Sequence, residues 1–275
     1  MFNETGDVVI VYNGEVYNFA EIRQELESKG HIFKTNTDTE AIVHAYEEWG
    51  VDCLARFNGM FAFCIRDKRN DRLFFARDRM GKKPLYYTVM NNTLIFASEL
   101  KALLVHPEVR RELSLRSLSA YLAFEYLPAP LTIFENIFKL EPGHFFVVNL
   151  LRPLPDRRNI RPQKYWDITF NPVTRTQEEI EEGFLEHFRK AVKLRLISDV
   201  PLGVFLSGGI DSSSVVAMMA ELMPPENIKT FSIGFEEKSF DETNYARLVA
   251  KFLGTDHRED ILKPQTLLDI LPEAV

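Results

Sequence analysis

Cysteine is scarce in this sequence. Only Cys53 and Cys64 occur among its 275 residues, and they do not form a Cys-x-x-Cys pair. This scarcity argues against a disulfide framework or a cysteine-based zinc site, and it favours a reducing compartment such as the cytoplasm. Neither cysteine is N-terminal or has a recognisable histidine partner, so we predict that both are core residues. The six histidines are scattered without the spacing of metal ligands.

The sequence also lacks a long apolar run and an excess of basic residues. No hydrophobic stretch approaches the roughly 20 residues that a membrane-spanning helix needs, and Met1–Glu4 does not resemble a signal peptide. The formal net charge is −7, with 27% charged and 45% hydrophobic residues. We therefore expect neither nucleic acid nor a membrane as a partner. The composition is that of a globular chain with room for two domains.

The most informative stretch is residues 200–214, Val-Pro-Leu-Gly-Val-Phe-Leu-Ser-Gly-Gly-Ile-Asp-Ser-Ser-Ser. The apolar run Val204–Leu206 predicts a short buried strand, and Ser207–Gly209 predicts a tight loop. Apolar residues return at helical spacing after Ser212, which predicts a helix. The stretch therefore reads as strand, glycine loop and helix.

Such a loop is suited to binding an anion. The N–H groups at the start of a helix have no intrahelical partners, and the helix dipole favours negative charge there. Glycines let the backbone approach a bound group closely, and the hydroxyls of Ser207 and Ser212 add donors. The carboxylate of Asp211 fits beside phosphate if Mg²⁺ lies between them.

The N-terminal part is typical of antiparallel β structure with a few helices. Apolar runs flank polar turns within residues 61–76 and again within residues 85–97. The dipeptide Asn13-Gly14 separates two apolar runs, which predicts a hairpin turn. Helices are predicted to begin at Asn18 and within Thr37–Glu40, each with a glutamate three residues after the cap.

The C-terminal part alternates helices and strands. A capping box at Thr176–Glu179 begins the first helix, and the alternation implies a parallel, doubly wound sheet. Ligands of such sheets bind at the carboxyl ends of the strands, where Ser207–Asp211 and Ser232–Phe235 are expected. A segment rich in arginine, proline and asparagine precedes this part. We predict two domains, residues 1–150 and residues 177–275, and a linker at residues 151–176.

Several pieces of both halves resemble the glutamine-hydrolysing asparagine synthetases, and the resemblance covers nearly the whole chain. The loop Ser-Gly-Gly-Ile-Asp-Ser resembles the pyrophosphate loop of the ATP pyrophosphatases. The other matching pieces are Val11–Asn18, Thr37–Glu40, Phe57–Phe63, Ala76–Tyr87, Ala97–Leu103 and Thr230–Phe235.

The resemblance implies an α+β glutaminase domain of the N-terminal-nucleophile type, followed by an α/β ATP-pyrophosphatase domain with a parallel sheet. It further implies a ligase with two sites. The first releases ammonia from glutamine. At the second, ATP with Mg²⁺ adenylates aspartate to β-aspartyl-AMP, with release of pyrophosphate, and ammonia displaces AMP to give asparagine. A homodimer is one assembly that the resemblance leaves open.

Four residues are implied in the glutaminase site. The positions of Asn13 and Gly14 form the family's oxyanion hole, which suits a side-chain amide and a backbone N–H. The positions of Glu15 and Asp38 hold the amino group of glutamine, as two carboxylates near an ammonium would. A purely structural interpretation stays open for each: Asn13-Gly14 as a turn, Asp38 as a helix cap and Glu15 as a solvated strand residue.

Seven residues are implied in the ATP site. Leu206 and Ile233 match positions that line the adenine and ribose pocket, although Ile233, an apolar residue in a strand, is expected to be buried in any case. Asp211 is the implied metal ligand. The pyrophosphate and Mg²⁺ site comprises Ser207, Gly208, Gly209, Asp211 and Ser212.

The sequence departs from the family at its start. The family's nucleophile is a cysteine directly after the initiator methionine, with its own α-amino group as base, whereas position 2 is Phe2 here. We expect the nucleophile region and a later ATP and aspartate loop to lie outside this chain, which would leave it incomplete for activity. Two alternatives stay open: a β-lactam synthetase-like enzyme that adenylates a carboxylate without glutaminase activity, and a non-catalytic ATP-binding remnant.

Overall fold

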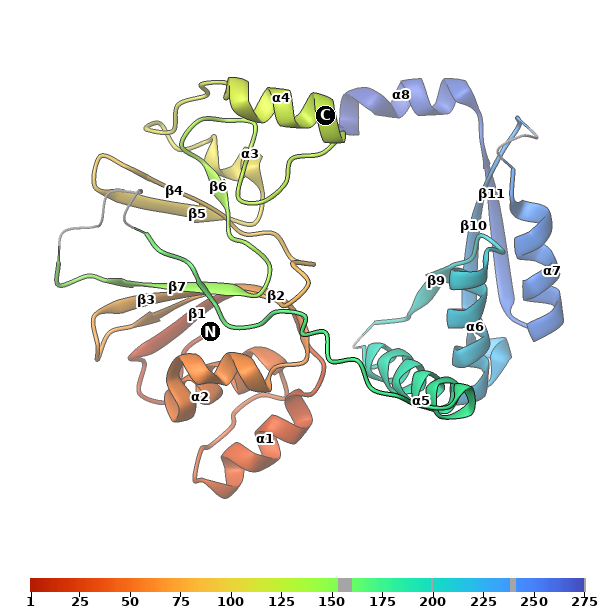
Figure 1. The fold of residues 1–275 in the computed structure, drawn as a ribbon, viewed down its shortest axis with the longest axis horizontal. Helices are drawn as coiled ribbons and strands as arrows, with labels where there is room; N and C mark the ends of the chain where they lie inside the picture. The colour runs from red at the N-terminus through yellow and green to blue at the C-terminus, as the bar shows by residue number, and fades with distance from the viewer. Residues whose placement is uncertain (153–159, 199, 238–240, 275) are drawn as a thin grey trace. The chain divides into compact units, whose positions relative to one another are not determined.

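The chain divides into two units (Figure 1), Met1–Asn171 and Pro172–Val275. The computed structural model describes residues 1–152, 160–198, 200–237 and 241–274. Ile160 is buried in the core of the first unit, and strand β8 (Gln163–Lys164) pairs with that unit's main sheet. Part of the segment predicted as a linker therefore packs in the first unit. Within the described ranges, none of the helices combines the length and apolar character that a membrane crossing requires.

The first unit contains two antiparallel sheets. The larger has the order β1-β2-β3-β7-β8, and the smaller has the order β5-β4-β6. The strands not yet bounded are β1 (Val8–Val16), β2 (Gly59–Asp67), β3 (Arg72–Arg77), β4 (Tyr86–Met90), β5 (Thr93–Ala97), β6 (Phe138–Lys139) and β7 (His144–Asn149). The helices are α1 (Phe19–Ser28), α2 (Asp38–Trp49), the 3-10 helix η1 (Gly50–Arg56), α3 (Leu100–Leu103) and α4 (Leu115–Phe124).

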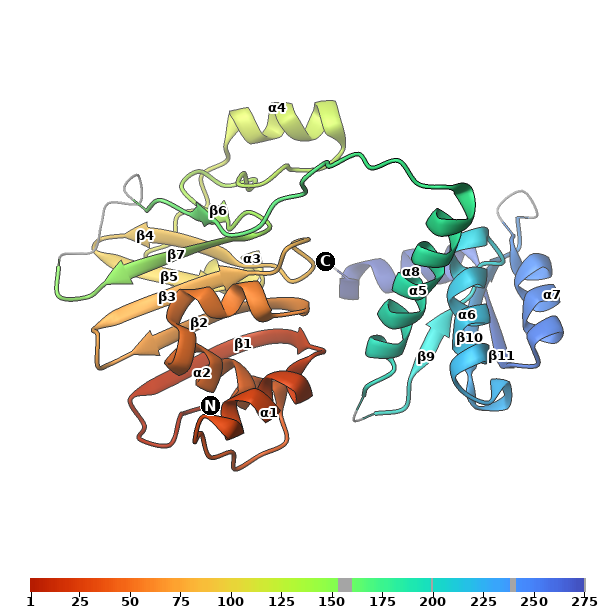
Figure 2. The ribbon, with the colours of Figure 1, turned by 60° about the horizontal axis from the view of Figure 1, so that its bottom comes forward.

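The larger sheet is covered on both faces, which explains the unbroken apolar run in β2. Phe61, Phe63 and Ile65 pack in a core shared with α1 and α2. Ala62 and Cys64 point the other way, into a core shared with the smaller sheet. Figure 1 shows α1 and α2 on one side of the larger sheet and strands β4 and β5 on the other, and Figure 2 shows α2 in front of the sheet. Because successive side chains of a strand alternate between faces, the middle of a strand buried on both faces carries apolar residues at successive positions.

The second unit has a three-stranded parallel sheet in the order β11-β10-β9. Its elements alternate as predicted, which confirms the α/β architecture. They are α5 (Gln177–Arg195), β9 (Gly203–Phe205), α6 (Ile210–Leu222), the 3-10 helix η3 (Pro225–Asn227), β10 (Lys229–Phe235), α7 (Thr243–Leu253), β11 (Asp256–Leu262) and α8 (Pro264–Ala274).

The predicted capping box at the start of α5 is also confirmed. The Thr176 side chain accepts a hydrogen bond from the Glu179 N–H, and the Glu179 carboxylate accepts one from the Thr176 N–H, at 3.2 and 2.9 Å. Helices α5, α6 and α7 contribute Val192, Val216 and Ala246 to one core with Leu206, which directly follows β9. This core therefore anchors the glycine loop that follows Leu206.

Candidate functional site

Asn13 and Gly14 lie inside the continuous strand β1, so the predicted hairpin turn is wrong. Asn13 pairs with Ala62 and Gly14 pairs with Phe61 of β2. Gly14 has a φ of +153°, and a Cβ atom there would lie 2.2 Å from the carbonyl oxygen of Met60. The close approach of β2 requires glycine at this position. Asn13-Gly14 therefore lies where β1 and β2 approach each other closely.

Asp38 is the first residue of α2, and its side chain reaches β1. Its Oδ2 accepts hydrogen bonds from the Tyr12 hydroxyl at 2.5 Å and from the Val16 N–H at 2.8 Å. The cap of α2 is Thr37, whose hydroxyl accepts a hydrogen bond from the Glu40 N–H at 3.3 Å. Asp38 is therefore not the capping residue; its carboxylate fastens α2 to the end of β1.

Tyr12 joins this group, although the sequence analysis did not select it. Burial, the hydrogen bond to Asp38 and the negative charges of Asp38 and Glu15 all raise the pKa of Tyr12. The phenol therefore stays protonated and donates to Asp38. Of the two predicted glutamine-binding carboxylates, Asp38 thus bonds to Tyr12 directly, and Glu15 acts on the same tyrosine through its charge. Tyr12 ends the apolar run before Asn13 and looks like an ordinary strand residue in sequence.

A second group that the sequence analysis missed is built around Asp78, which is buried. The segment Arg77–Lys83 looks like a solvated basic loop in sequence. In the structure the Asp78 carboxylate accepts hydrogen bonds at 3.0–3.2 Å from the N–H groups of Phe61, Met80, Lys82 and Lys83. This loop is therefore tied to β2 at Phe61, the residue that pairs with Gly14.

Cys53 and Cys64 are both buried, which confirms them as core residues. Burial raises the pKa of both thiols, to about 12 for Cys64. Because the thiolate is the nucleophilic form, neither cysteine is prepared for nucleophilic catalysis.

The loop after β9 in the second unit is held by a compact set of hydrogen bonds. The hydroxyls of Ser207 and Ser212 lie 3.0 Å apart. The Ser207 N–H donates to the Ser212 hydroxyl, and the Gly209 N–H donates to the Ser207 hydroxyl, each at 3.2 Å. Gly209 caps α6. The predicted order of strand, glycine loop and helix is confirmed, and the two predicted serine donors lie side by side. The predicted burial of the strand is wrong, because Phe205 of β9 is 76% exposed.

Leu206 and Gly208 hold the loop against β10 and α7. Leu206 is buried, and its N–H donates to the Phe231 carbonyl of β10 at 2.8 Å; its own carbonyl accepts from the Ser232 hydroxyl. Gly208 has a φ of +82°, and a Cβ atom there would lie 2.5 Å from the carbonyl carbon of Tyr245 in α7. The loop therefore packs directly on the first turns of α7.

A pocket of about 170 Å³ lies beside this loop, at the carboxyl ends of β9 and β10. Ile233 lines it and is 49% exposed, so the expectation that Ile233 would be buried is wrong. Its neighbours Ser232 and Gly234 are buried on the opposite face of β10, where Gly234 lies against Thr243 of α7. Asp211 is exposed in the first turn of α6. The pocket lining comprises Phe205, Leu206, Ser207, Phe231, Ser232, Ile233, Phe235, Glu242, Thr243 and Ala246.

Two family models match this chain. A glutamine amidotransferase domain matches residues 1–166, and an asparagine synthase domain matches residues 183–275. The first match agrees with the fold class predicted for the N-terminal half, and the second agrees with the parallel-sheet unit described above.

Sequence similarity to curated relatives extends over nearly the whole chain. It is 40% identical over 271 residues to a putative glutamine-hydrolysing asparagine synthetase of Methanocaldococcus jannaschii, covering 98% of this chain and 51% of the relative. It is 38% identical over 266 residues to asparagine synthetase 1 of Bacillus subtilis, covering 97% of this chain and 41% of the relative. The chain thus spans about half or less of these relatives. Among solved structures, the glutamine phosphoribosylpyrophosphate amidotransferase of Bacillus subtilis matches 94% of this chain and 47% of its own, with 16% identity and a TM-score of 0.39.

Proposed function

Because this chain belongs to the family of glutamine-hydrolysing asparagine synthetases, we propose that it carries parts of two sites, one for glutamine and one for ATP. The overall reaction amidates aspartate to asparagine. ATP adenylates the side-chain carboxylate and pyrophosphate leaves. Ammonia from glutamine then attacks β-aspartyl-AMP and displaces AMP. We also propose that residues 1–150 belong to the glutaminase part and residues 177–275 to the synthetase part, and that the later part of residues 151–176 links them.

The observation that carries the proposal is the loop at the start of α6. Gly208 lets the loop pack on α7, Gly209 leaves the backbone open to a bound group, and α6 directs its N-terminal dipole toward the loop. The hydroxyls of Ser207 and Ser212 lie 3.0 Å apart. Two hydroxyls at this spacing can each donate to an oxygen of the pyrophosphate group as it accumulates negative charge, which stabilises the departure of pyrophosphate.

The adjacent pocket supports the placing of the nucleoside. Leu206 and Ile233 line it together with Phe205 and Phe231. Such an apolar lining beside a polar loop suits a purine ring joined to phosphates.

Asp211 fits Mg²⁺, because its carboxylate is exposed within the first turn of α6. Mg²⁺ is usually held by one or two carboxylates together with phosphate oxygens and waters. When bound, the ion would neutralise charge on the phosphates. Asp211 would hold the ion beside the loop. Without the ion, the Asp211 carboxylate would repel phosphate.

In the first unit, Glu15 and Asp38 are proposed to bind the α-ammonium group of glutamine. The hydrogen bond from Tyr12 orients the Asp38 carboxylate. Asn13 and Gly14 are proposed to stabilise the oxyanion of the tetrahedral intermediate, which needs donors held in fixed positions. Their rigid pairing with β2 supports this role. The nucleophile is neither Cys53 nor Cys64, because both thiols are buried with raised pKa values.

Titration calorimetry with Mg-ATP tests the ATP site. We expect the unaltered chain to release heat, Asp211→Ala to abolish it, and the control Asp256→Ala, an exposed aspartate of β11, to leave it unchanged. Equal binding by all three proteins would refute the role of Asp211. No binding by the unaltered chain would refute the ATP site.

A further inference from the structure

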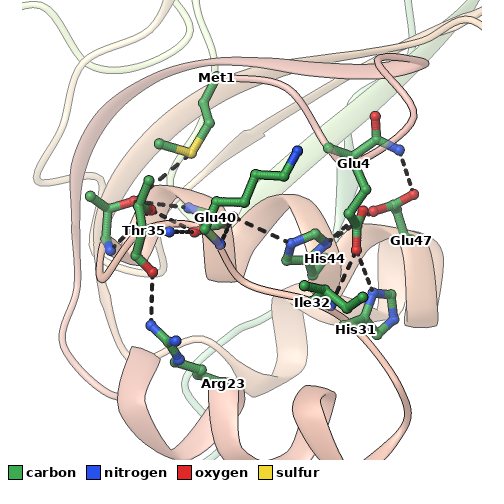
Figure 3. Close-up of polar contacts among 12 residues, drawn as sticks. Met1, Glu4, Arg23, His31, Ile32, Thr35, Glu40, His44 and Glu47 are labelled. Carbon is green, nitrogen blue, oxygen red and sulfur yellow. Dashed lines mark hydrogen bonds and ion pairs between the residues drawn. The ribbon is translucent and has the colours of Figure 1, made fainter.

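Two histidines and two glutamates come together beside the C-terminal half of α2. Figure 3 shows Glu4 from the N-terminal turn, His31 from the segment after α1, and His44 and Glu47 from α2 directed toward one another. One nitrogen or oxygen atom of each residue lies within 4.8 Å of those of the other three. The proposed function uses none of these side chains.

The spacing of these atoms is close to that of a tetrahedral metal site. His44 Nδ1 lies 3.1 Å from Glu47 Oε2 and 3.4 Å from Glu4 Oε2. His31 Nδ1 lies 3.9 Å from Glu4 Oε1. Ligand bonds of about 2.0–2.1 Å in tetrahedral geometry place neighbouring ligand atoms about 3.4 Å apart. The three distances above lie within about half an ångström of this value, and no two of the four ligand atoms lie more than 4.8 Å apart.

Neighbouring residues orient two of the four side chains. Glu47 Oε1 accepts hydrogen bonds from Asn3 at 2.7 Å and Arg69 at 3.0 Å, which directs Oε2 toward His44. His44 is 1% exposed, and its Nε2 has no hydrogen-bond partner among the described residues. Glu40 Oε1 lies 3.8 Å from that nitrogen. A carboxylate behind the second ring nitrogen is the usual setting of a metal-binding histidine.

The charge balance also favours a divalent cation. Glu4 and Glu47 contribute two negative charges, and only Arg69 is ion-paired with either among the lysines and arginines of the described chain. Glu48 adds another carboxylate 3.5 Å from His31 Nε2, although Lys29 pairs with it at 2.8 Å. Two imidazoles with two carboxylates form a donor set that suits zinc better than magnesium or calcium, which prefer oxygen ligands alone.

We propose that Glu4, His31, His44 and Glu47 form a structural site for zinc or a similar divalent transition metal. Four protein ligands leave no open coordination position, as in structural rather than catalytic zinc sites. The ion would fasten the N-terminal turn and the segment after α1 to α2. Because α2 begins at Asp38, the same ion would steady the helix that presents this carboxylate to β1.

Zinc binding by the full chain tests this proposal. The protein, without a histidine tag, is stripped with EDTA and titrated with ZnCl₂ against a chromophoric chelator. We expect one zinc ion per chain. His31→Asn and Glu4→Gln change partly exposed side chains, so both variants should fold, and each should weaken zinc binding at least about tenfold, as loss of metal-site partners generally does. The control His187→Asn, an exposed histidine of α5, should bind zinc like the unaltered chain.

Thermal unfolding provides a second readout. Zinc should raise the melting temperature of the unaltered chain and of His187→Asn, and it should raise that of His31→Asn and Glu4→Gln less. The proposal is overturned if the stripped chain binds no zinc. It is equally overturned if both ligand variants bind zinc as tightly as the control.

Discussion

Replacing Gly208 with alanine should disrupt the loop that precedes α6, whereas the same change at Gly209 should be tolerated. At Gly208 the φ of +82° is a left-handed conformation, and the new Cβ would lie 2.5–2.6 Å from backbone atoms of Tyr245 and Ala246. At Gly209 the φ is −71°, and the nearest atom to a new Cβ is the Ser207 hydroxyl oxygen at 3.3 Å. Backbone atoms of a packed helix cannot move aside as a hydroxyl can.

The cost at Gly208 has three parts. A left-handed conformation costs alanine about 1–2 kcal/mol. Overpacking against fixed atoms costs about 1–3 kcal/mol. Alanine also lowers the conformational entropy of the unfolded chain, which stabilises the folded state by about 0.4–1 kcal/mol. The free energy of unfolding should therefore fall by about 1–5 kcal/mol for Gly208→Ala and change by less than about 1 kcal/mol for Gly209→Ala.

Hydrogen exchange measured by mass spectrometry is the suitable assay, because it reports on the second unit separately from the first. Amides of β9, β10 and α6 should lose protection in Gly208→Ala and keep it in Gly209→Ala, while peptides from the first unit stay unchanged in both. Equal protection of these amides in the two variants would refute the packing argument, since they share the same chemical change.

Three further substitutions test the core beneath the glycine loop and two carboxylates of the first unit. Leu206→Ala, at a side chain 1% exposed, should lower the free energy of unfolding of the second unit by about 2–5 kcal/mol, measured by hydrogen exchange. Asp38→Asn weakens two hydrogen bonds to one carboxylate oxygen and should cost the first unit about 1–3 kcal/mol, measured by tryptophan fluorescence in urea. Burial alone would raise the pKa of Asp67, but hydrogen bonds from Asn70 and Tyr46 lower it overall. Its folded pKa thus lies below the unfolded value of about 3.9, so its stabilisation is present above that value and is lost as pH falls through the folded pKa. The free energy of unfolding of Asp67→Asn should therefore depend less on pH at acid pH than that of the unaltered chain.

Each of these changes has a matched comparison. Leu202→Ala, at a residue 38% exposed, should cost less than Leu206→Ala; a larger cost would contradict the assigned core. Asp52→Asn, at an exposed position of η1, should leave urea unfolding unchanged, and an effect equal to that of Asp38→Asn would remove the specific role of the carboxylate. For Asp67, an unaltered slope of stability against pH below about pH 4 would contradict the reasoning.

Local patterns were sufficient for the loop of the second unit. The apolar run, the two glycines and the helical spacing lie within fifteen consecutive residues, 200–214. They correctly predict the order of β9, the loop and α6, although not the exposure of β9, because each signal depends on neighbours in the chain. The capping box at Thr176 is correct for the same reason.

Contacts between distant residues account for the errors. Asn13-Gly14 has the composition of a turn, but its conformation depends on the pairing with Met60 and Phe61 in β2. The burial of Ile233 depends on which face of β10 packs on α7. A sequence pattern records the apolar character of a strand residue, but not which face of its sheet another element will cover.

Sequence patterns alone predicted the alternation of helices and strands in the second unit, the burial of both cysteines and the position of the glycine loop, since propensity and apolar spacing act over a few residues. Three groups could be recognised only in the folded chain: Asp38 with Tyr12, Asp78 with the loop after β3, and His31 and His44 with Glu4. Each of these groups joins residues from separate elements, and their distances depend on the packing of helices on the sheet.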